Sequence, residues 1–326
     1  MTPGYAAYAV WAFFVLSGFL MTHVLKTSYG FTTKGTAAYM YNRVLRIFPA
    51  YYVALAAGVV TLNIASRHGM EVTILNPQFA MPSGWNWLNP LSLLSIFPAA
   101  QLPVPVSNAL ALEVTAYLLM PLLAGSASAA ALAATLSATF TLGYLGLGVT
   151  SFADRYALFL PCILAFAWGS LTWYCKEHLK VLRAPLLSML IWLIHGALWQ
   201  WFSLWPWTYG LYVSLPLSSW VVISLFTAPG NKVDRWLGDL SYPVYLFHTT
   251  VGAWLLPLLG FKRSFALFVA SFIVTIAVAA LVVALIEKPL ARLKRGHRAS
   301  KAASSAPRRP DVPNVGLISA SEASRP

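Results

Sequence analysis

The stretch FFVLSGFLMTHVL, residues 13–25, lies close to the start of the chain. It is apolar enough to lie in lipid, yet it carries Ser17, Gly18 and His23. A spanning helix needs about 20 mostly apolar residues to cross ~30 Å of hydrocarbon, and residues 5–25 meet that length. The segment lacks the basic residues before it and the small-residue cleavage site after it that a signal peptide has. We therefore predict a true membrane span.

The composition of the whole chain indicates the same solvent. Hydrophobic residues make up 59% of the sequence, charged residues 10%, and the mean hydropathy is +0.68. These values exclude an ordinary soluble domain and predict an all-α, polytopic membrane helix bundle. About nine apolar windows bounded by charge, Pro or Gly are long enough to span, near residues 5–25, 48–65, 106–124, 127–150, 156–174, 185–204, 209–227, 239–259 and 265–287.

The basic residues predict how these spans are oriented. With nine spans and the N-terminus outside, 18 of the 22 Lys and Arg residues fall on the cytoplasmic side, where such residues are retained. We therefore expect a multi-pass protein of the bacterial inner membrane, with the N-terminus outside and the C-terminus in the cytoplasm. The formal charge of +13 then follows from topology and anionic lipid, and no nucleic-acid recognition module is visible.

Two segments do not match a span. Residues 66–107 contain SGWNWLNP and several prolines, so we expect an external loop with its aromatic side chains at the headgroup level. Residues 294–326 are rich in Ser, Ala, Pro and Arg without hydrophobic periodicity, which is typical of a disordered basic cytoplasmic tail. The chain thus divides into a transmembrane domain, 1–293, and this tail. Cys162 and Cys175 share one predicted helix, which keeps them too far apart for a disulfide.

Polar groups placed inside lipid are costly, and they are the first candidates for a functional site. Glu113 lies about seven residues into its span, ~10 Å from the outer boundary, with Tyr117 one turn further on the same face. One interpretation is a carboxyl that is neutral, or paired with an Arg, and locks helices together. The other is a general base or an anchor for a substrate hydroxyl. The sequence leaves both open.

A second group of polar residues lies in WLGDLSYPVYLFHTTV. Ser241, Tyr245 and His248 have the spacing i, i+4, i+7, so they form one polar stripe on a helix. The stripe could face the bundle and contact a substrate. Pro243 in the same helix frees a backbone carbonyl, however, and one of these groups could merely satisfy it.

The third element is YNRVLRIFPAYY. Arg43 and Arg46 are one helical turn apart, and Pro49 suits the first turn of the next span, so we expect the pair at the cytoplasmic membrane face. Two guanidinium groups there could hold a phosphate or pyrophosphate, although most juxtamembrane arginines only contact lipid headgroups. Glu287, at the inner end of the last span, is a candidate counter-charge. No metal-binding motif is visible.

Five segments together resemble the acyltransferase 3 family of bacterial membrane acyltransferases. FFVLSGFL, RVLRIFPAYY, LEVTAYLLMPLL, LGDLSYPVYLFH and IEKPLARL occur in the family's order, between about residues 9 and 293. The resemblance implies a ten-span inner-membrane protein without a permanently bound cofactor. It also implies transfer of an acyl group, usually acetyl, from cytoplasmic acyl-CoA to a hydroxyl of a lipopolysaccharide, another exported polysaccharide or a lipid-linked sugar.

Combined with the residues above, the resemblance implies roles for individual side chains. Arg43 and Arg46 match the family's paired arginines and would bind the phosphates of CoA. Glu113 would position or deprotonate the acceptor hydroxyl. The full set that we expect comprises catalytic Glu113, Tyr245 and His248, CoA-binding Arg43 and Arg46, and a substrate path of Ser17, Tyr117, Ser241 and Glu287.

In the family, a helix carrying an Arg and the catalytic His usually precedes the FFVLSGF segment. The present chain has no residues for that helix and is one span short of ten, which agrees with the external N-terminus that the charge count favours. We therefore expect either a shortened version of a longer protein or an inactive homologue. The alternative from another class is a transporter or flippase of lipid-linked sugars, because polar groups near the bilayer midplane also mark substrate paths.

Overall fold

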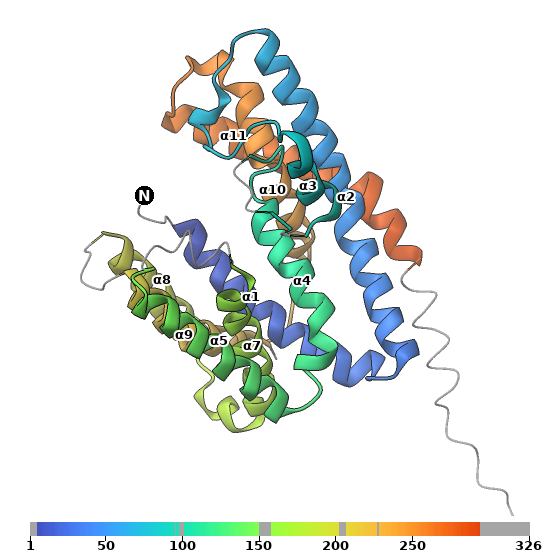
Figure 1. The fold of residues 1–326 in the computed structure, drawn as a ribbon, viewed down its shortest axis with the longest axis vertical. Helices are drawn as coiled ribbons and strands as arrows, with labels where there is room; N and C mark the ends of the chain where they lie inside the picture. Colours follow the sequence, from blue (N-terminus) through green and yellow to red (C-terminus); the bar gives the residue numbers. More distant parts are fainter. Residues whose placement is uncertain are drawn as a thin grey trace, which may run out of the picture.

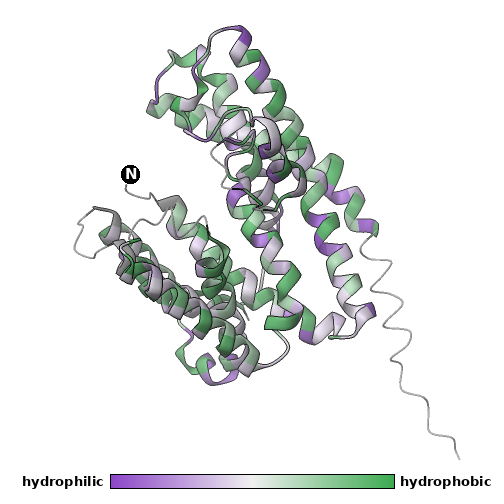
Figure 2. Ribbon diagram, in the orientation of Figure 1, coloured by the Kyte–Doolittle hydropathy of each residue, from purple (hydrophilic) through white to green (hydrophobic). Residues whose placement is uncertain are grey.

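The predicted all-α fold is confirmed by the computed structural model, which describes residues 5–94, 96–97, 101–149, 158–201, 207–226 and 228–293. Within these ranges every regular element is a helix and none is a strand (Figure 1). Hydrophobic residues run along most of the helical surface, and hydrophilic ones gather mainly at helix ends and in loops (Figure 2). Such a surface suits a protein whose solvent is the bilayer.

The main helices are α1 (Tyr5–Val24), α2 (Thr33–Arg67), α3 (Leu88–Ser92), α4 (Ser107–Leu123), α5 (Ala127–Gly146), α7 (Phe159–Leu179), α8 (Pro185–Trp201), α9 (Trp207–Phe226), α10 (Lys232–Leu255) and α11 (Phe265–Val282). Two of them continue through a π-helical turn, α1 into Leu25–Tyr29 and α11 into Val283–Glu287. A helix therefore lies over each predicted window, in whole or in part.

A test that requires both sufficient helix length and high mean hydropathy accepts fewer spans than the apolar windows of the sequence do. In the described part of the chain, four helices could cross a membrane alone: Ala7–Tyr29, Thr33–Arg67, Ala127–Gly146 and Phe265–Leu293. A fifth span results if Phe159–Leu182 and Pro185–Trp199, which meet at 111°, count as one broken span. The structure therefore supports several spans, and the total of nine stays a prediction.

The helices form two groups joined by α4 (Figure 1). In the first group, α1 packs against α7 and α9, α5 against α7, and α8 against α9. In the second, α10 packs against α11 and α2, and the turn Val283–Glu287 packs against α2. Helix α4 touches α1, α5 and α7 on one side and α2 on the other, and the turn Leu25–Tyr29 that continues α1 also packs against α2, so these two elements link the groups.

Helix α1 approaches α7 unusually closely because two glycines face the contact. A Cβ atom on Gly18 would lie 2.0 Å from the carbonyl oxygen of Phe166, and one on Gly169 would lie 2.0 Å from that of Val15. Small residues of this kind allow backbones to approach inside membranes, where packing rather than water drives association. The Phe14 and Phe166 rings stack beside them, 4.7 Å apart. The SGF of the opening segment thus sets the position of α1.

One expected boundary is wrong. We predicted that Pro49 begins a span, but α2 continues through it from Thr33 to Arg67. A proline removes only one intrahelical hydrogen bond, and neighbouring helices can supply partners for the groups that it frees. The carbonyl that Pro49 frees is that of Leu45, and nearby the Tyr242 hydroxyl of α10 donates to the carbonyl of Ile47 at 2.8 Å, which fastens this part of α2 to α10. Consequently, Arg43 and Arg46 lie in the body of a long helix and not before its start.

The predicted external loop is partly ordered by short helices. Val72–Ile74, Gly84–Trp87 and α3 lie within it, and Arg263 from the α10–α11 connection donates to the carbonyls of Ile74 and Leu75 at 2.6 and 3.0 Å. The predicted tail, 294–326, lies outside the described residues. As expected, both cysteines are free thiols, and Cys162 is buried while Cys175 is exposed.

The close contact between α1 and α7 predicts how one methyl group added at Gly18 changes the stability of the protein. Gly18→Ala should lower the free energy of unfolding by about 1–3 kcal/mol, because a backbone oxygen occupies the space that the methyl needs. Thermal unfolding of the purified protein in detergent measures this change. Gly143→Ala on α5 is the matched control: nothing lies within 4 Å of its Cβ position, so stability should stay the same or rise slightly. Equal melting temperatures for the two variants would contradict the prediction.

Candidate functional site

The centre of the site is a carboxyl group held between α1 and α4. Glu113 is buried, with 6% of its surface exposed, and Ser17 and Tyr117 are buried beside it. The Tyr117 hydroxyl donates to Glu113 Oε1. Ser17 Oγ lies 3.3 Å from the same oxygen and 3.0 Å from the Tyr117 hydroxyl. One carboxylate oxygen therefore receives hydrogen bonds from two helices.

The sequence builds this cluster from local spacing and one close approach. Glu113 and Tyr117 are four residues apart on α4, so their side chains meet on one face. Ser17 precedes Gly18, the residue at the tight contact between α1 and α7, and α4 packs against both helices. The predicted pairing of Glu113 with Tyr117 is confirmed, and Ser17 joins them.

Helix α2 brings positive charge to the cluster. The guanidinium carbon of Arg43 lies 5.8 Å from the Tyr117 ring centroid and 5.7 Å from that of Tyr39, within the range of cation–π contacts. Both Arg43 and Arg46 interact electrostatically with Glu113. We expected the arginines at the cytoplasmic face and Glu113 nearer the outside. Within the protein the two groups are closer than this expectation implied, because the continuous helix α2 runs past α4 and places Arg43 beside Tyr117, the partner of Glu113. Their depths in the membrane stay predictions.

Several buried polar atoms of α2 face this region without a hydrogen-bond partner among the described residues. They are Tyr39 OH, Asn42 Oδ1 and Arg43 Nε. A buried polar atom that makes no hydrogen bond costs about 1–3 kcal/mol, so proteins seldom retain several together without a use. A hydroxyl, an amide oxygen and a guanidinium N–H could contact a bound polar molecule.

Two tyrosines of α10, a helix of the second group, also contact the region around Glu113. Tyr242 lies against α2 through its bond to the Ile47 carbonyl, and it interacts electrostatically with both Glu113 and Glu287. The Tyr245 hydroxyl donates at 3.2 Å to the carbonyl of Val106, the N-cap of α4, and this tyrosine also interacts with Glu113. Of the predicted stripe, Tyr245 thus belongs to the cluster.

The rest of the stripe bonds within its own helix. Ser241 is exposed, and its hydroxyl donates to the Gly238 carbonyl at 2.8 Å. His248 is also exposed, with Nδ1 2.9 Å from the Tyr245 carbonyl oxygen and Nε2 3.3 Å from the Thr249 hydroxyl. These contacts are local to the helix, but neither carbonyl is that of Asp239, four residues before Pro243, which the proline leaves without its helical N–H donor. Glu287 lies in the π-helical turn that packs against α2, the helix that carries both arginines.

Sequence reasoning missed Tyr39 and Tyr242. Tyr39 precedes Arg43 by four residues, so the helical spacing that paired Glu113 with Tyr117 would have found it. Tyr242 lies between Ser241 and Tyr245 in the sequence, and the i, i+4, i+7 spacing of the predicted stripe does not include it. Its position depends on how α10 packs against α2, which the sequence does not state.

The assembled groups suit proton transfer beside an anion. Glu113 can accept a proton, Tyr117 and Ser17 can orient its carboxylate, and two guanidinium groups can bind phosphate or stabilise a developing negative charge. The carboxylate, the hydroxyls and the arginines come from α1, α2 and α4, which meet where the two helix groups join (Figure 1).

Comparisons with known proteins point to the same chemistry. Nodulation protein 10 of Rhizobium leguminosarum bv. viciae is 28% identical to the chain, over 89% of the chain and 83% of that protein. No solved structure matches the chain. The model of a family described as an acyltransferase domain matches residues 5–284, which include four of the five segments of the resemblance and end just before IEKPLARL. The chain therefore belongs to the acyltransferase 3 family of membrane acyltransferases.

Proposed function

We propose that this acyltransferase moves an acyl group, most simply acetyl, from cytoplasmic acyl-CoA to a hydroxyl of an exported or cell-surface glycan in the bacterial inner membrane. The observation that carries the proposal is the buried carboxylate of Glu113, which two hydroxyl groups orient and two arginines face. Family membership supplies the reaction type, and the cluster supplies the groups that the reaction needs.

In the proposed reaction Glu113 acts on the acceptor. Its carboxylate takes the proton of the attacking hydroxyl while the hydroxyl oxygen forms a bond to the thioester carbonyl carbon. The carbon–sulfur bond then breaks, and CoA leaves as a thiolate that takes up the proton. Ser17 and Tyr117 hold one carboxylate oxygen, which limits the directions from which the acceptor can approach.

Arg43 and Arg46 act on the donor in this proposal. CoA carries a pyrophosphate and a further phosphate, and guanidinium groups make bidentate, charge-assisted hydrogen bonds to such anions. Arg46 is exposed, and Arg43 is partly buried with its Nε free of a hydrogen bond among the described residues. Arg43 could thus contact the thioester end of the donor or the developing oxyanion, and Arg46 a phosphate nearer to water.

The role of Glu113 in acyl transfer is tested by a substitution that removes the charge of its side chain and keeps the shape. Glu113→Gln should lower acyl transfer at least about 100-fold, because an amide cannot take the proton. The measurement is transfer of radiolabelled acetyl from acetyl-CoA in membranes of cells that express the complete reading frame. Glu71→Gln, an exposed acid of the external loop, is the matched control and should retain activity. Full activity of folded Glu113→Gln would overturn the assignment.

The donor site is tested by binding. The double variant Arg43→Ala/Arg46→Ala should bind CoA at least about tenfold more weakly than the unaltered protein, because two charge-assisted contacts are lost. Calorimetric titration of the detergent-solubilised protein with CoA measures the affinity. Arg67→Ala, an exposed arginine at the far end of the same helix, should leave it unchanged. Unchanged affinity in the folded double variant would remove the arginines from the donor site.

A further inference from the structure

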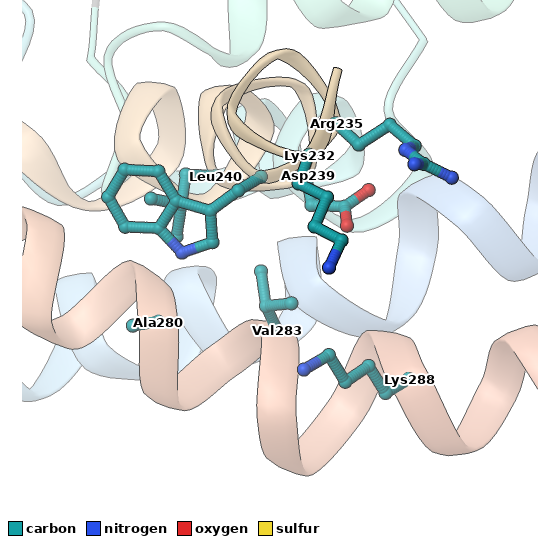
Figure 3. A pocket seen from close by; sticks show the side chains of 8 residues that line it. Lys232, Arg235, Asp239, Leu240, Ala280, Val283 and Lys288 are labelled. Atoms are coloured by element: carbon teal, nitrogen blue, oxygen red, sulfur yellow. The ribbon is translucent and has the colours of Figure 1, made fainter. Parts of the chain in front are cut away.

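A second candidate site lies away from Glu113, where the first turns of α10 meet the end of α11. A cavity of about 290 Å³ is lined there by Lys232, Arg235 and Asp239 of α10 and by Val283 and Lys288 of the other segment, with Trp236 among the remaining lining residues. In Figure 3, Lys232 and Lys288 extend toward the same space from opposite sides, and Arg235 turns outward. None of these residues belongs to the cluster around Glu113.

The lining carries an excess of positive charge. The lining contains three basic residues, Lys232, Arg235 and Lys288, and one acidic residue, Asp239. Among the described residues, no ion pair within 4.0 Å joins any of the three basic residues to Asp239. Arg235 Nε makes a long contact of 3.4 Å with the Asn231 carbonyl oxygen. Asn231 and Asp234 form a capping box at the start of α10, so the backbone there is already satisfied. The ammonium groups of the two lysines are therefore available to an anion.

The surroundings of the cavity are apolar. Val233, Trp236 and Leu237 on α10 are at least half exposed, and so are Leu281 and Leu285 beside Val283. Leu240, Ala280 and Val283 line the cavity itself. This combination of basic side chains, an exposed indole and apolar helix surface is typical of the place where a membrane helix ends at an interface with water. A soluble anion needs only the charges, whereas a phospholipid uses the charges and the apolar surface together.

From this arrangement we infer that the cavity binds the headgroup phosphate of an anionic phospholipid, with an acyl chain along the exposed surface of α11. All three cations fall on the side that the charge count assigns to the cytoplasm, so the lipid belongs to that leaflet. This site is separate from the proposed acyl-transfer centre. The first lining residues of α10 lie two to three turns from Tyr242, which contacts α2.

Native mass spectrometry of the detergent-solubilised protein tests the inference without any acyl transfer. The chain is titrated with dioleoyl phosphatidylglycerol and, separately, with dioleoyl phosphatidylcholine. Phosphatidylglycerol should bind more tightly. Lys232→Gln/Lys288→Gln should weaken the binding of phosphatidylglycerol about tenfold or more, because two charges that attract the phosphate are lost. Asp239→Asn should strengthen the binding, because a charge that repels the phosphate is lost. Lys34→Gln/Lys262→Gln removes the same charge from two exposed lysines elsewhere and should leave the affinity unchanged.

Three results would overturn the inference. The first is equal affinity for the two lipids, and the second is an equal loss in the control variant, which would indicate general attraction to a basic protein. The third is loss of CoA affinity in Lys232→Gln/Lys288→Gln with phosphatidylglycerol binding intact, because the cavity would then hold a phosphate of CoA. Circular dichroism and elution as a single species establish that each variant is folded. Asp239→Asn should raise the affinity for phosphatidylglycerol and not that for phosphatidylcholine, whereas a folding defect that exposes apolar surface would not favour the anionic headgroup.

Discussion

The structure depends on satisfying one carboxylate inside a protein whose outside is lipid. Glu113 is buried, so helices must bring hydrogen-bond donors to it, and the cost of failing to do so is several kcal/mol. The donors are Ser17 on α1 and Tyr117 on α4 itself, and Arg43 and Arg46 on α2 add positive charge. Because α2 and α1 belong to different helix groups, the carboxylate also couples the two halves of the molecule.

Sequence reasoning found the chemistry of this cluster and misjudged its geometry. Glu113 and Tyr117 were predictable because helical spacing alone places them on one face. The arginines were found, but Pro49 was taken as a boundary, which moved them toward the cytoplasm. A proline ends a helix when nothing else holds the chain, and here the packing of α10 against α2 holds it. Tyr242 and Tyr39 were missed because their roles follow from packing between helices.

Helix α10 connects the two sites proposed above. Its first turns line the basic cavity, Tyr242 and Tyr245 in its middle contact α2 and the start of α4, and His248 lies further along. A rigid helix shared by two sites can transmit a small displacement from one to the other, provided that its packing has two arrangements. The hydrogen bonds of Tyr242 to the Ile47 carbonyl and of Tyr245 to the Val106 carbonyl are the contacts that such a displacement would strain first.

The continuity of α2 has a consequence for the bilayer. Its 35 residues extend about 52 Å, well beyond ~30 Å of hydrocarbon, so it lies tilted or carries an end into water. Helix α4, with 17 residues, reaches only about 25 Å. The first part of this short helix is mostly surrounded by protein, whereas Leu118 and Leu122 near its C-terminal end are exposed. The helix whose length exceeds the hydrocarbon thickness is therefore α2. Its tilt can adjust to bilayers of different thickness, while the polar cluster stays at a fixed place on α4.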